Sequence, residues 1–373
     1  MKVSNGVKIQ DVARLATVSP STVSNVLNGR DERMRPETKE RVLHAIEQLS
    51  YTPSQVARQL KTGQAKIIGL IVPSVANPFW GMVARDVESV ALTYGYQVLL
   101  CNAERNPMRE RHYAESLWAS GVRGVIFGSS PISFEHLAPL AKRGLLVVAF
   151  DRQAQSADQV VASSVGVDNV LGGRLAAEHL VSLGHRHIGF LSGPIRTVSR
   201  RDRLDGHFTA LVEAGLEPDP SLIWEGSSIS AYGDIEGADL GRIGARALLD
   251  RPYRPTAICA INDMYALGAY AGASDLGLRV PDDVSIVGFD DISIAAVAQP
   301  ALTTVKQPLS AMMQAVVTSL ISRLEGVQTI PAEHIIVPPE LIIRSSTTEF
   351  LLESSSFTDV LPIVQAAPHR SKR

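Results

Sequence analysis

The chain has 373 residues, of which 45% are hydrophobic, and its 36 Lys and Arg nearly balance 38 Asp and Glu. This length exceeds what one hydrophobic core supports, so we expect a small domain followed by two further lobes. Cys101 and Cys259 lie in apolar runs, which favours buried thiols over a disulfide or a metal pair. The absence of a signal-peptide pattern and of a membrane-length apolar run predicts a cytoplasmic protein.

The first fifty residues are typical of three short helices. The first begins near Ile9, with apolar residues at helical spacing at Val12, Ala13 and Ala16. The second begins at Ser19, a good helix cap, with Pro20 at the first helical position, where a missing N–H costs nothing. The third begins at Pro36 and is expected to close the bundle with Val42, Leu43, Ile46 and Leu49.

The second helix carries apolar and polar residues on opposite faces. Val23, Val26 and Leu27 form the apolar face, which should pack on the first helix. The other face holds short hydrogen-bonding side chains, namely Ser21, Ser24, Asn25 and Asn28. A recognition helix presents such a stripe to base edges in the major groove. The alternative interpretation is a three-helix bundle with no nucleic-acid role.

The distribution of charge favours nucleic-acid binding. Residues 1–66 hold 11 Lys or Arg and 6 Asp or Glu, a net charge of +5. The remaining residues hold 25 basic and 32 acidic side chains, a net charge of −7. A basic head on a mildly acidic body is the pattern of a protein that binds phosphates at one end.

A short helical segment follows the bundle, between residues 51 and 66. It has a Pro-Ser start but only about two helical turns before Gly63. A helix this short is marginal alone in water, so we expect it to order on a partner. Val56, Ala57 and Leu60 share one face, beside Arg58 and Lys61. The alternative interpretation is a flexible linker.

The stretches DVARLATVSPSTVSNVLNG, TKERVLHAIEQLSYTPS and VARQLKTG resemble the LacI/GalR family of bacterial transcription regulators. The resemblance implies a homodimer on a near-palindromic DNA operator. It also implies that two copies of the short helix, the hinge, pair in the minor groove, where Leu60 wedges into the central base step. The implied DNA contacts are Ser19, Pro20, Ser21, Thr22, Ser24, Asn25, Asn28, Ala57, Arg58, Leu60 and Lys61.

Two positions depart from the family pattern. Arg35 stands where relatives often have a Ser cap for the third helix, which predicts a weakly capped start. Pro20 stands where relatives often have a base-contacting side chain, so base reading should depend on Ser21 and Asn25. The side chains of Ser21 and Asn25 can each hydrogen-bond more than one kind of base, so the operator sequence does not follow from them.

From Lys66 onward, short apolar runs alternate with helical stretches, which predicts parallel sheets covered by helices on both faces. Strands are expected at residues 67–72, 98–101, 124–127, 145–150, 164–167, 187–191, 257–261 and 284–289, and helices at 82–93, 172–183, 234–249 and 264–276. This is an α/β pattern with more units than one ordinary sheet holds. The family resemblance implies a two-lobed core of doubly wound sheets, like the type I periplasmic binding proteins.

The expected organisation is a helix-turn-helix head over residues 1–52, a hinge over 53–64, and an effector-binding and dimerisation domain over 65–345. By analogy with the family, lobe 1 covers about 65–163 and 292–325, and lobe 2 about 164–291 and 326–345. Residues 346–373 are rich in Ser and Thr, contain two prolines and follow no heptad, which predicts a mobile tail. A homodimer is therefore the default assembly.

Ligands of parallel α/β sheets bind beyond the carboxyl ends of the strands, so the residues there are candidates for a site. Five strand ends carry amides, carboxylates, guanidinium groups or an aromatic ring, which suit the hydroxyls and the C–H face of a sugar. The resemblance supports Asn77, Phe79, Asp151, Arg152, Arg203, Asn262, Asp263 and Asp290 as effector contacts. Each has a structural alternative, because such residues also cap helices, form turns or pack in a core.

Motifs for dinucleotides, phosphate loops, hydrolase elbows and zinc proteases do not occur in the sequence, so we expect neither a cofactor nor an enzyme. His185 and His187 have no third ligand nearby, which favours a strand-orienting role over a metal site. Ser228 stands where purine-responsive relatives present a stacking aromatic residue, which argues against a purine.

The sequence therefore predicts a DNA-binding repressor that is controlled by a small molecule, expected to be a sugar, bound between the two lobes. A nucleoside or a phosphorylated metabolite, the latter held by Arg200, Arg201 and Arg203, is the alternative effector. Corepression is the alternative to induction. A periplasmic ligand-binding protein is the competing class, but it would have no use for residues 1–62.

Overall fold

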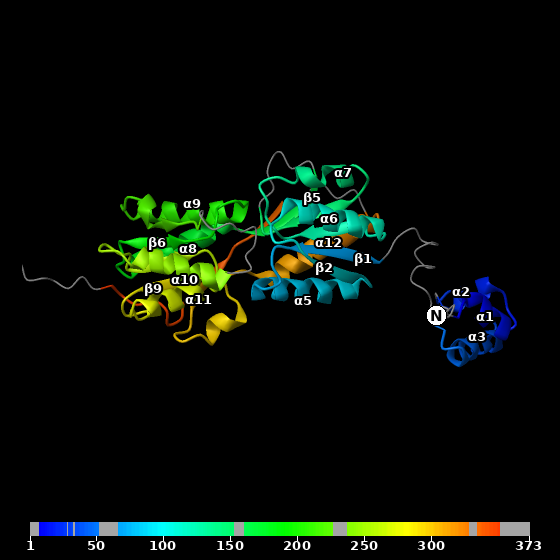
Figure 1. Ribbon diagram of the computed structural model, residues 1–373. Helices are drawn as coiled ribbons and strands as arrows, with labels where there is room; N and C mark the ends of the chain where they lie inside the picture. Colours follow the sequence, from blue (N-terminus) through cyan, green and yellow to red (C-terminus); the bar gives the residue numbers. More distant parts are fainter. Residues whose placement is uncertain are drawn as a thin grey trace, which may run out of the picture. The chain divides into compact units, whose positions relative to one another are not determined.

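The computed structural model describes residues 7–27, 29–32, 34–51, 66–152, 160–226, 237–327 and 334–350. The chain divides into two compact units that interleave along the sequence (Figure 1). Unit 1 comprises Met1–Gly166, Ala231–Ile235 and Leu309–Val337, and unit 2 comprises Val167–Ser230, Glu236–Pro308 and Pro338–Arg373. Each unit contains one six-stranded sheet, and the residues of the helical head are part of unit 1.

Three helices form the head: α1 (Ile9–Leu15), α2 (Pro20–Leu27) and α3 (Pro36–Gln48). The cap predicted for α2 is confirmed, since the Ser19 hydroxyl accepts a hydrogen bond of 3.1 Å from the Thr22 amide. The weak start predicted for α3 is also confirmed, because Arg35 makes no side-chain capping bond. The bundle core consists of Val12, Ala13, Ala16, Val23, Val26, Val42, Ala45 and Tyr51.

Leu43 was expected in this core and is instead 49% exposed. The buried face of α3 runs through Val42 and Ala45, three residues apart, and continues to the half-buried Leu49. Leu43 lies about 100° around the helix from Val42, which turns its side chain toward solvent.

The sheet of unit 1 has the strand order β11-β5-β4-β3-β1-β2. Its strands are β1 (Ile67–Val72), β2 (Gln97–Asn102), β3 (Gly124–Phe127), β4 (Leu146–Phe150), β5 (Val161–Val167) and β11 (His334–Val337). The helices of this unit are α5 (Pro78–Thr93), α6 (Pro107–Ala119), α7 (Ala138–Ala141) and α12 (Leu309–Leu324). Pairings from β2 through β1, β3 and β4 to β5 are parallel, which confirms the predicted α/β class.

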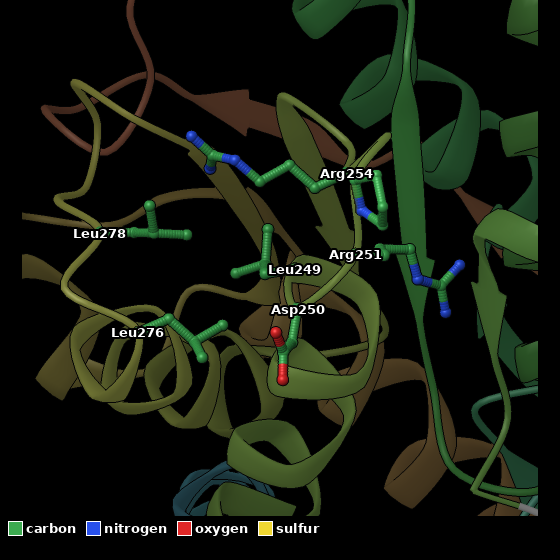
Figure 2. Close-up of a pocket in the computed structure, with 7 residues that line it drawn as sticks. Leu249, Asp250, Arg251, Arg254, Leu276 and Leu278 are labelled. Atoms are coloured by element: carbon green, nitrogen blue, oxygen red, sulfur yellow. The ribbon is translucent and has the colours of Figure 1, made fainter.

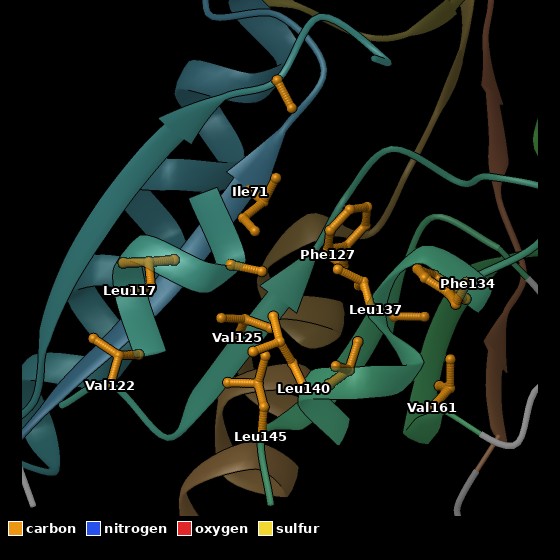
Figure 3. Close-up of a cluster of buried hydrophobic side chains, with 14 residues drawn as sticks. Ile71, Leu117, Val122, Val125, Phe127, Phe134, Leu137, Leu140, Leu145 and Val161 are labelled. Atoms are coloured by element: carbon orange, nitrogen blue, oxygen red, sulfur yellow. The ribbon is translucent and has the colours of Figure 1, made fainter. Parts of the chain in front are cut away.

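One face of this sheet packs into an apolar cluster with α6 and α7 (Figure 3). Ile71, Val125 and Phe127 come from the strands, and Leu117 and Leu140 come from the helices. All five are at most 5% exposed. This cluster fixes the strands of unit 1 and so fixes the positions of the residues that follow them.

The sheet of unit 2 has the strand order β12-β10-β9-β8-β6-β7. Its strands are β6 (Ile188–Leu191), β7 (Ile223–Trp224), β8 (Ala257–Ala260), β9 (Ser285–Asp290), β10 (Thr303–Lys306) and β12 (Glu340–Ile342). The helices of this unit are α8 (Asn169–Ser182), α9 (Val198–Glu213), α10 (Gly237–Leu249) and α11 (Asp263–Asp275). Gly206 lets α9 approach α8 closely, because a Cβ atom there would lie 2.0 Å from the Val170 carbonyl oxygen.

The chain passes between units after Gly166, Pro308 and Val337, whereas crossings were expected near residues 163, 292 and 325. The second boundary moves because the unpredicted strand β10 pairs in parallel with β9 and keeps residues 292–308 in unit 2. The third moves because β11 belongs to the sheet of unit 1. Strand β10 has the sequence TTVK, in which three of four residues are polar or charged, so its apolar signal is weak, and β11 is a short strand of four residues.

The tail was expected to begin at Ser346, but residues 346–350 pack on unit 2. The Ser346 hydroxyl donates to the Ile286 carbonyl oxygen at 2.6 Å and accepts from the Thr303 amide at 2.8 Å. The Phe350 backbone amide donates to the Leu183 carbonyl oxygen at 2.8 Å, and the Phe350 ring stacks on the His185 ring. The Ser346 hydroxyl thus serves as a partner for two strands, and the rest of the predicted tail, residues 351–373, lies outside the described residues.

The His185 imidazole lies within hydrogen-bond distance of Thr256 and Ser285, and its burial lowers its pKa. These contacts join the segment before β6 to the residue before β8 and to the first residue of β9, which is the strand-orienting role predicted for it. Cys259 is buried and Cys101 is half-buried, and both are free thiols. Within the described residues, the helices are too short or too polar to cross a membrane.

Candidate functional site

The exposed face of α2 carries the residues predicted to read DNA. Ser21 and Asn25 are exposed, while Val23 and Val26 on the same helix are buried in the bundle. Of the other predicted contacts, Ser19 and Pro20 are exposed and Thr22 and Ser24 are half-buried. Asn28, Ala57, Arg58, Leu60 and Lys61 lie outside the described residues.

Hydroxyl groups gather at the N-terminus of α2. The Ser19 Oγ atom lies 2.6 Å from Ser21 Oγ and 2.9 Å from Thr22 Oγ1. These groups stand beside the first backbone N–H groups of the helix, whose dipole attracts anions. The face can therefore bind a phosphate at its start and present Asn25, an amide able to pair with adenine, one turn further on.

At the carboxyl edge of the unit 1 sheet, Asn77 and Phe79 have structural roles, which were the alternative to their prediction as effector contacts. Asn77 caps α5, since its side-chain oxygen accepts from the Phe79 amide at 3.0 Å. The Phe79 ring is 3% exposed and packs against Trp80 and Phe150, with ring centroids 5.1 Å and 6.5 Å away. These contacts support the fold and give no separate indication of a ligand.

Asp151 and Arg152 follow β4 at the same edge. Asp151 has a φ angle of 64°, a left-handed conformation that is uncommon for a residue other than glycine. Arg152 is fully buried, donates to the Pro131 carbonyl oxygen, and holds its guanidinium 4.8 Å from the Phe134 ring centroid. The structure thus anchors Arg152 on the loop after β3, while the strained Asp151 backbone lies at the end of the strand.

Arg105, Ser129 and Ser130 lie at this edge and were not predicted. Arg105 comes after β2, and its Nη1 atom donates to the Ser129 carbonyl oxygen at 2.9 Å. Ser129 and Ser130 follow β3 and are buried. All three follow strands that the sequence predicts, at 98–101 and 124–127, so their position after a strand end is the signal that indicates them.

In unit 2, Arg203 and Asp290 lie close together, with Nη1 4.0 Å from Oδ1. Arg203 comes from α9 and its guanidinium lies 3.5 Å from the Phe289 ring centroid. Its Nε atom donates to Asn169 Oδ1 and its Nη1 atom to the Ile261 carbonyl oxygen, both at 2.7 Å. The guanidinium is therefore held in one orientation at the carboxyl ends of β8 and β9.

Gln307 and Asn169 extend this polar cluster and were not predicted. The Gln307 side-chain amide donates to Asp290 Oδ1 at 2.8 Å, and the Asp290 backbone has a φ angle of 113°. Gln307 comes directly after β10, so its omission follows from the missed strand. Asn169 opens α8, two residues after the strand predicted at 164–167, so its position after a strand end was an available signal that the prediction did not use. We call Asn169, Arg203, Phe289, Asp290 and Gln307 the polar cluster of unit 2.

Asn262 and Asp263 open α11 and serve the fold. The Asn262 side chain caps the helix by accepting from the Tyr265 amide at 3.0 Å. Asp263 is fully buried and accepts from the Thr304 hydroxyl at 2.5 Å and from the Ile292 amide at 2.9 Å. Burial, and then the charge of Asp290, raise the pKa of Asp263 well above its usual range. The structure therefore favours a structural role for Asp263, as an acceptor for Thr304 and Ile292 and not as the helix cap that was its alternative, over direct contact with an effector.

A pocket of about 350 Å³ lies elsewhere on unit 2 (Figure 2). It is lined by Leu249, Asp250, Arg251, Pro252, Arg254, Leu276 and Leu278. These residues follow α10 and α11 and precede β8 and β9, so the pocket lies at the amino edge of the sheet. It contains none of the predicted effector contacts. Among the described residues, no group of three or more His, Cys, Asp or Glu is placed to hold a metal ion.

Comparison with known proteins matches both parts of the chain. Residues 8–54 match the family model described as bacterial regulatory proteins, lacI family, and residues 177–347 match a periplasmic binding protein-like domain. The HTH-type transcriptional regulator DegA of Bacillus subtilis (strain 168) is 35% identical over 340 residues, which cover 91% of this chain and 98% of DegA.

Solved structures agree along nearly the same length. A lac repressor dimer bound to operator and the anti-inducer ONPF is 29% identical with a TM-score of 0.78, covering 92% of this chain and 100% of that one. A complex of the transcriptional regulator CelR with cellobiose is 30% identical with a TM-score of 0.66, covering 91% and 99%. The predicted family and two-lobed fold are confirmed: the chain is a DNA-binding transcriptional regulator that belongs to the lacI family of bacterial regulatory proteins.

Proposed function

We propose that the chain is a repressor, not an enzyme, and that it binds a near-palindromic operator as a homodimer. The observation that carries the proposal is the exposed polar face of α2 on a helix whose other face is fixed in the head core. The lac repressor is a dimer on its operator in the similar solved structure, which supports the same arrangement for this chain. The basic excess of residues 1–66 supplies attraction to the phosphate backbone.

Exposed apolar residues on unit 1 support the proposed homodimer. Strand β2 is the edge of its sheet, and its Leu99 and Leu100 are 42% and 47% exposed. Leu92 near the end of the adjacent α5 is also exposed. Apolar side chains on both faces of an edge strand favour burial against another chain.

The effector that best fits the polar cluster of unit 2 is a sugar. Asp290 offers a carboxylate that accepts from hydroxyls, and Arg203 offers a fixed set of N–H donors beside it. The Asn169 and Gln307 amides hold these two groups in place, which reduces the entropy lost on binding. The CelR structure contains cellobiose, which supports a sugar for this chain too.

A sugar phosphate is the second candidate effector. Arg200 and Arg203 are both buried and stand one helical turn apart on α9, whereas Arg201 is exposed. The Arg200 Nη1 atom donates to the Pro194 carbonyl oxygen at 3.0 Å. Two buried guanidinium groups on one helix face favour an anionic group on the ligand.

Operator selection from a random duplex pool tests the DNA-binding part. We expect enrichment of a near-palindrome, and we expect Asn25→Ala to reduce discrimination against scrambled DNA by about 1–3 kcal/mol. Gln48→Ala, which removes an exposed amide from α3, is the matched control and should bind as wild type. A folded protein that enriches no sequence, or an Asn25 variant that discriminates normally, would contradict the assignment of α2.

A thermal-shift screen of sugars, sugar phosphates and nucleosides tests the effector. A ligand at 100 times its Kd stabilises the folded chain by about 2.7 kcal/mol, so its melting temperature should rise by several degrees. A response to neutral sugars supports the first candidate, and a response only to phosphorylated ones supports the second. A response confined to nucleosides would contradict both.

A further inference from the structure

Basic side chains gather at the amino edge of the unit 1 sheet, where the strands begin. Lys66 precedes β1, Arg123 precedes β3, and Lys142 and Arg143 precede β4. We call these four residues the basic edge. In the described segments at this edge, the one acidic group is Glu325, which follows α12 and pairs with Lys66 at 3.4 Å. The basic edge is thus a positive region on a body that carries a net −7 beyond residue 66.

The structure holds part of this edge in place and leaves the rest exposed. Arg123 is fixed, because its Nη1 atom donates to the Trp118 and Val122 carbonyl oxygens at 3.1 Å and 3.0 Å. Its guanidinium lies 4.1 Å from the Trp118 ring centroid, and that of Arg143 lies 5.3 Å from it. Lys142 and Arg143 are exposed and form no ion pair with a described residue. Their charges are therefore accessible to a partner.

The chain from the head enters unit 1 at this same edge. Fourteen residues, 52–65, separate Tyr51 of the head from Lys66, which directly precedes β1. A fully extended chain covers at most about 3.3–3.6 Å per residue, so this segment spans no more than about 50 Å. Tyr51 of the head must therefore lie within that distance of Lys66, which keeps DNA bound by the head near unit 1. The carboxyl edge of β1, six residues further along the strand, is farther from the point of attachment by about 20 Å.

We propose that the basic edge binds backbone phosphates of the DNA on either side of the operator. The proposal rests on the proposed function, because the head must first bring DNA within reach. Lys and Arg bind phosphates without reading bases, so these contacts add affinity on any flanking sequence. Each phosphate contact releases counterions and makes log Kd depend more steeply on log salt, by about 0.9. The basic edge therefore increases affinity and salt sensitivity only when flanking DNA is present.

The test compares two duplexes with the full-length chain: the selected operator alone, and the operator extended by about 10 base pairs, one helical turn, at each end. Binding is measured by fluorescence anisotropy from 50 to 200 mM salt. The wild type should bind the long duplex more tightly, with a steeper salt slope. For the variant Lys142→Gln/Arg143→Gln, the slope of log Kd against log salt on the long duplex should be smaller than that of the wild type by about 1–2. On the short duplex, the variant should bind as the wild type does.

The matched control is Arg85→Gln/Arg111→Gln, which removes two exposed charges from α5 and α6 of the same unit. It should keep the full response to flanking DNA. If the wild type shows the same slope of log Kd against log salt on both duplexes, the proposal is overturned. It is also overturned if the control loses as much of that slope on the long duplex as the Lys142→Gln/Arg143→Gln variant does, because the effect would then come from net charge alone. Failure of the proposed function is distinguishable, because the wild type would then not bind the short operator selectively. Equal melting temperatures for the two variants show that both are folded.

Discussion

The carboxyl edges of the two sheets carry similar residue types but use them differently. In unit 2, Arg203 and Asp290 lie 4.0 Å apart and are held by side chains from other elements. In unit 1, Asn77 caps a helix and Phe79 packs in the core. The role of a polar residue after a strand therefore depends on which neighbours occupy its atoms. Residue type and position identify the candidates, and the surrounding contacts decide between a ligand contact and a brace.

The largest expected effect separates the two roles within unit 2. Asp263→Ala leaves the Thr304 hydroxyl and the Ile292 amide without their buried acceptor, and each buried unsatisfied donor costs about 1–3 kcal/mol. We therefore expect the free energy of unfolding to fall by about 2–6 kcal/mol, measured by urea denaturation. Asp290→Ala, one strand away, should cost less stability. Equal losses of the free energy of unfolding in Asp263→Ala and Asp290→Ala would show that the two carboxylates have the same structural role.

Acid should affect unit 2 through His207, which is fully buried on α9. Burial lowers the pKa of His207 from 6.5 to about 4. In the unfolded chain this histidine takes up a proton as the pH falls below 6.5, whereas the folded chain resists protonation until about pH 4. Its contribution to stability is therefore complete above pH 6.5 and is lost between pH 6.5 and 4, by about 3 kcal/mol at most.

Urea denaturation of His207→Gln across this pH range measures that contribution. The variant should show a shallower loss of stability on acidification than the wild type. His112→Gln, at an exposed position on α6 of unit 1, is the control and should follow the wild-type curve. Parallel curves for His207→Gln and the wild type would place the acid sensitivity elsewhere.

A smaller effect is expected at the unit 1 edge. Asn77→Ala removes the cap of α5, which should lower the free energy of unfolding by about 1 kcal/mol. Asn77→Ser or Asn77→Asp, which restore an N-cap acceptor, should recover most of it. If Asn77 serves only as a cap, effector affinity should fall in Asn77→Ala and recover in the Ser and Asp variants together with the free energy of unfolding. A loss of effector binding in the stable Asp variant would show that unit 1 also contributes ligand contacts here.

The sequence predicted the elements whose signal is local and strong. The strands β1, β3 and β4 consist of apolar residues and glycine, and α2 has both its cap and its two faces in consecutive residues. The strand β10 was missed because TTVK has little apolar character, although it pairs along its full length with β9. Ser346 was assigned to a tail because its role as a hydrogen-bond partner of two strands depends on tertiary contacts.

The same limit applies to the site. Arg203 and Asp290 were predicted together, because each comes after a strand that the sequence shows clearly. Gln307 was missed because it follows β10. Asn169 follows the predicted strand 164–167, but its role depends on the contact with Arg203 of α9, which the sequence does not show. Asp263 looks the same as Asp290 in sequence, since both stand at the end of an apolar run. The difference between them arises from Thr304 and Ile292, which are distant in the chain and close in the fold.

We expect the polar cluster of unit 2 to couple effector binding to DNA binding. The most direct test is operator release by Asp290→Ala, titrated with the sugar that gives the largest thermal shift. We expect operator affinity equal to wild type and release that needs about 5- to 150-fold more effector, which corresponds to the loss of about 1–3 kcal/mol at one hydrogen-bonded group. An unchanged release curve with a lowered melting temperature would contradict it and make Asp290 a brace like Asp263.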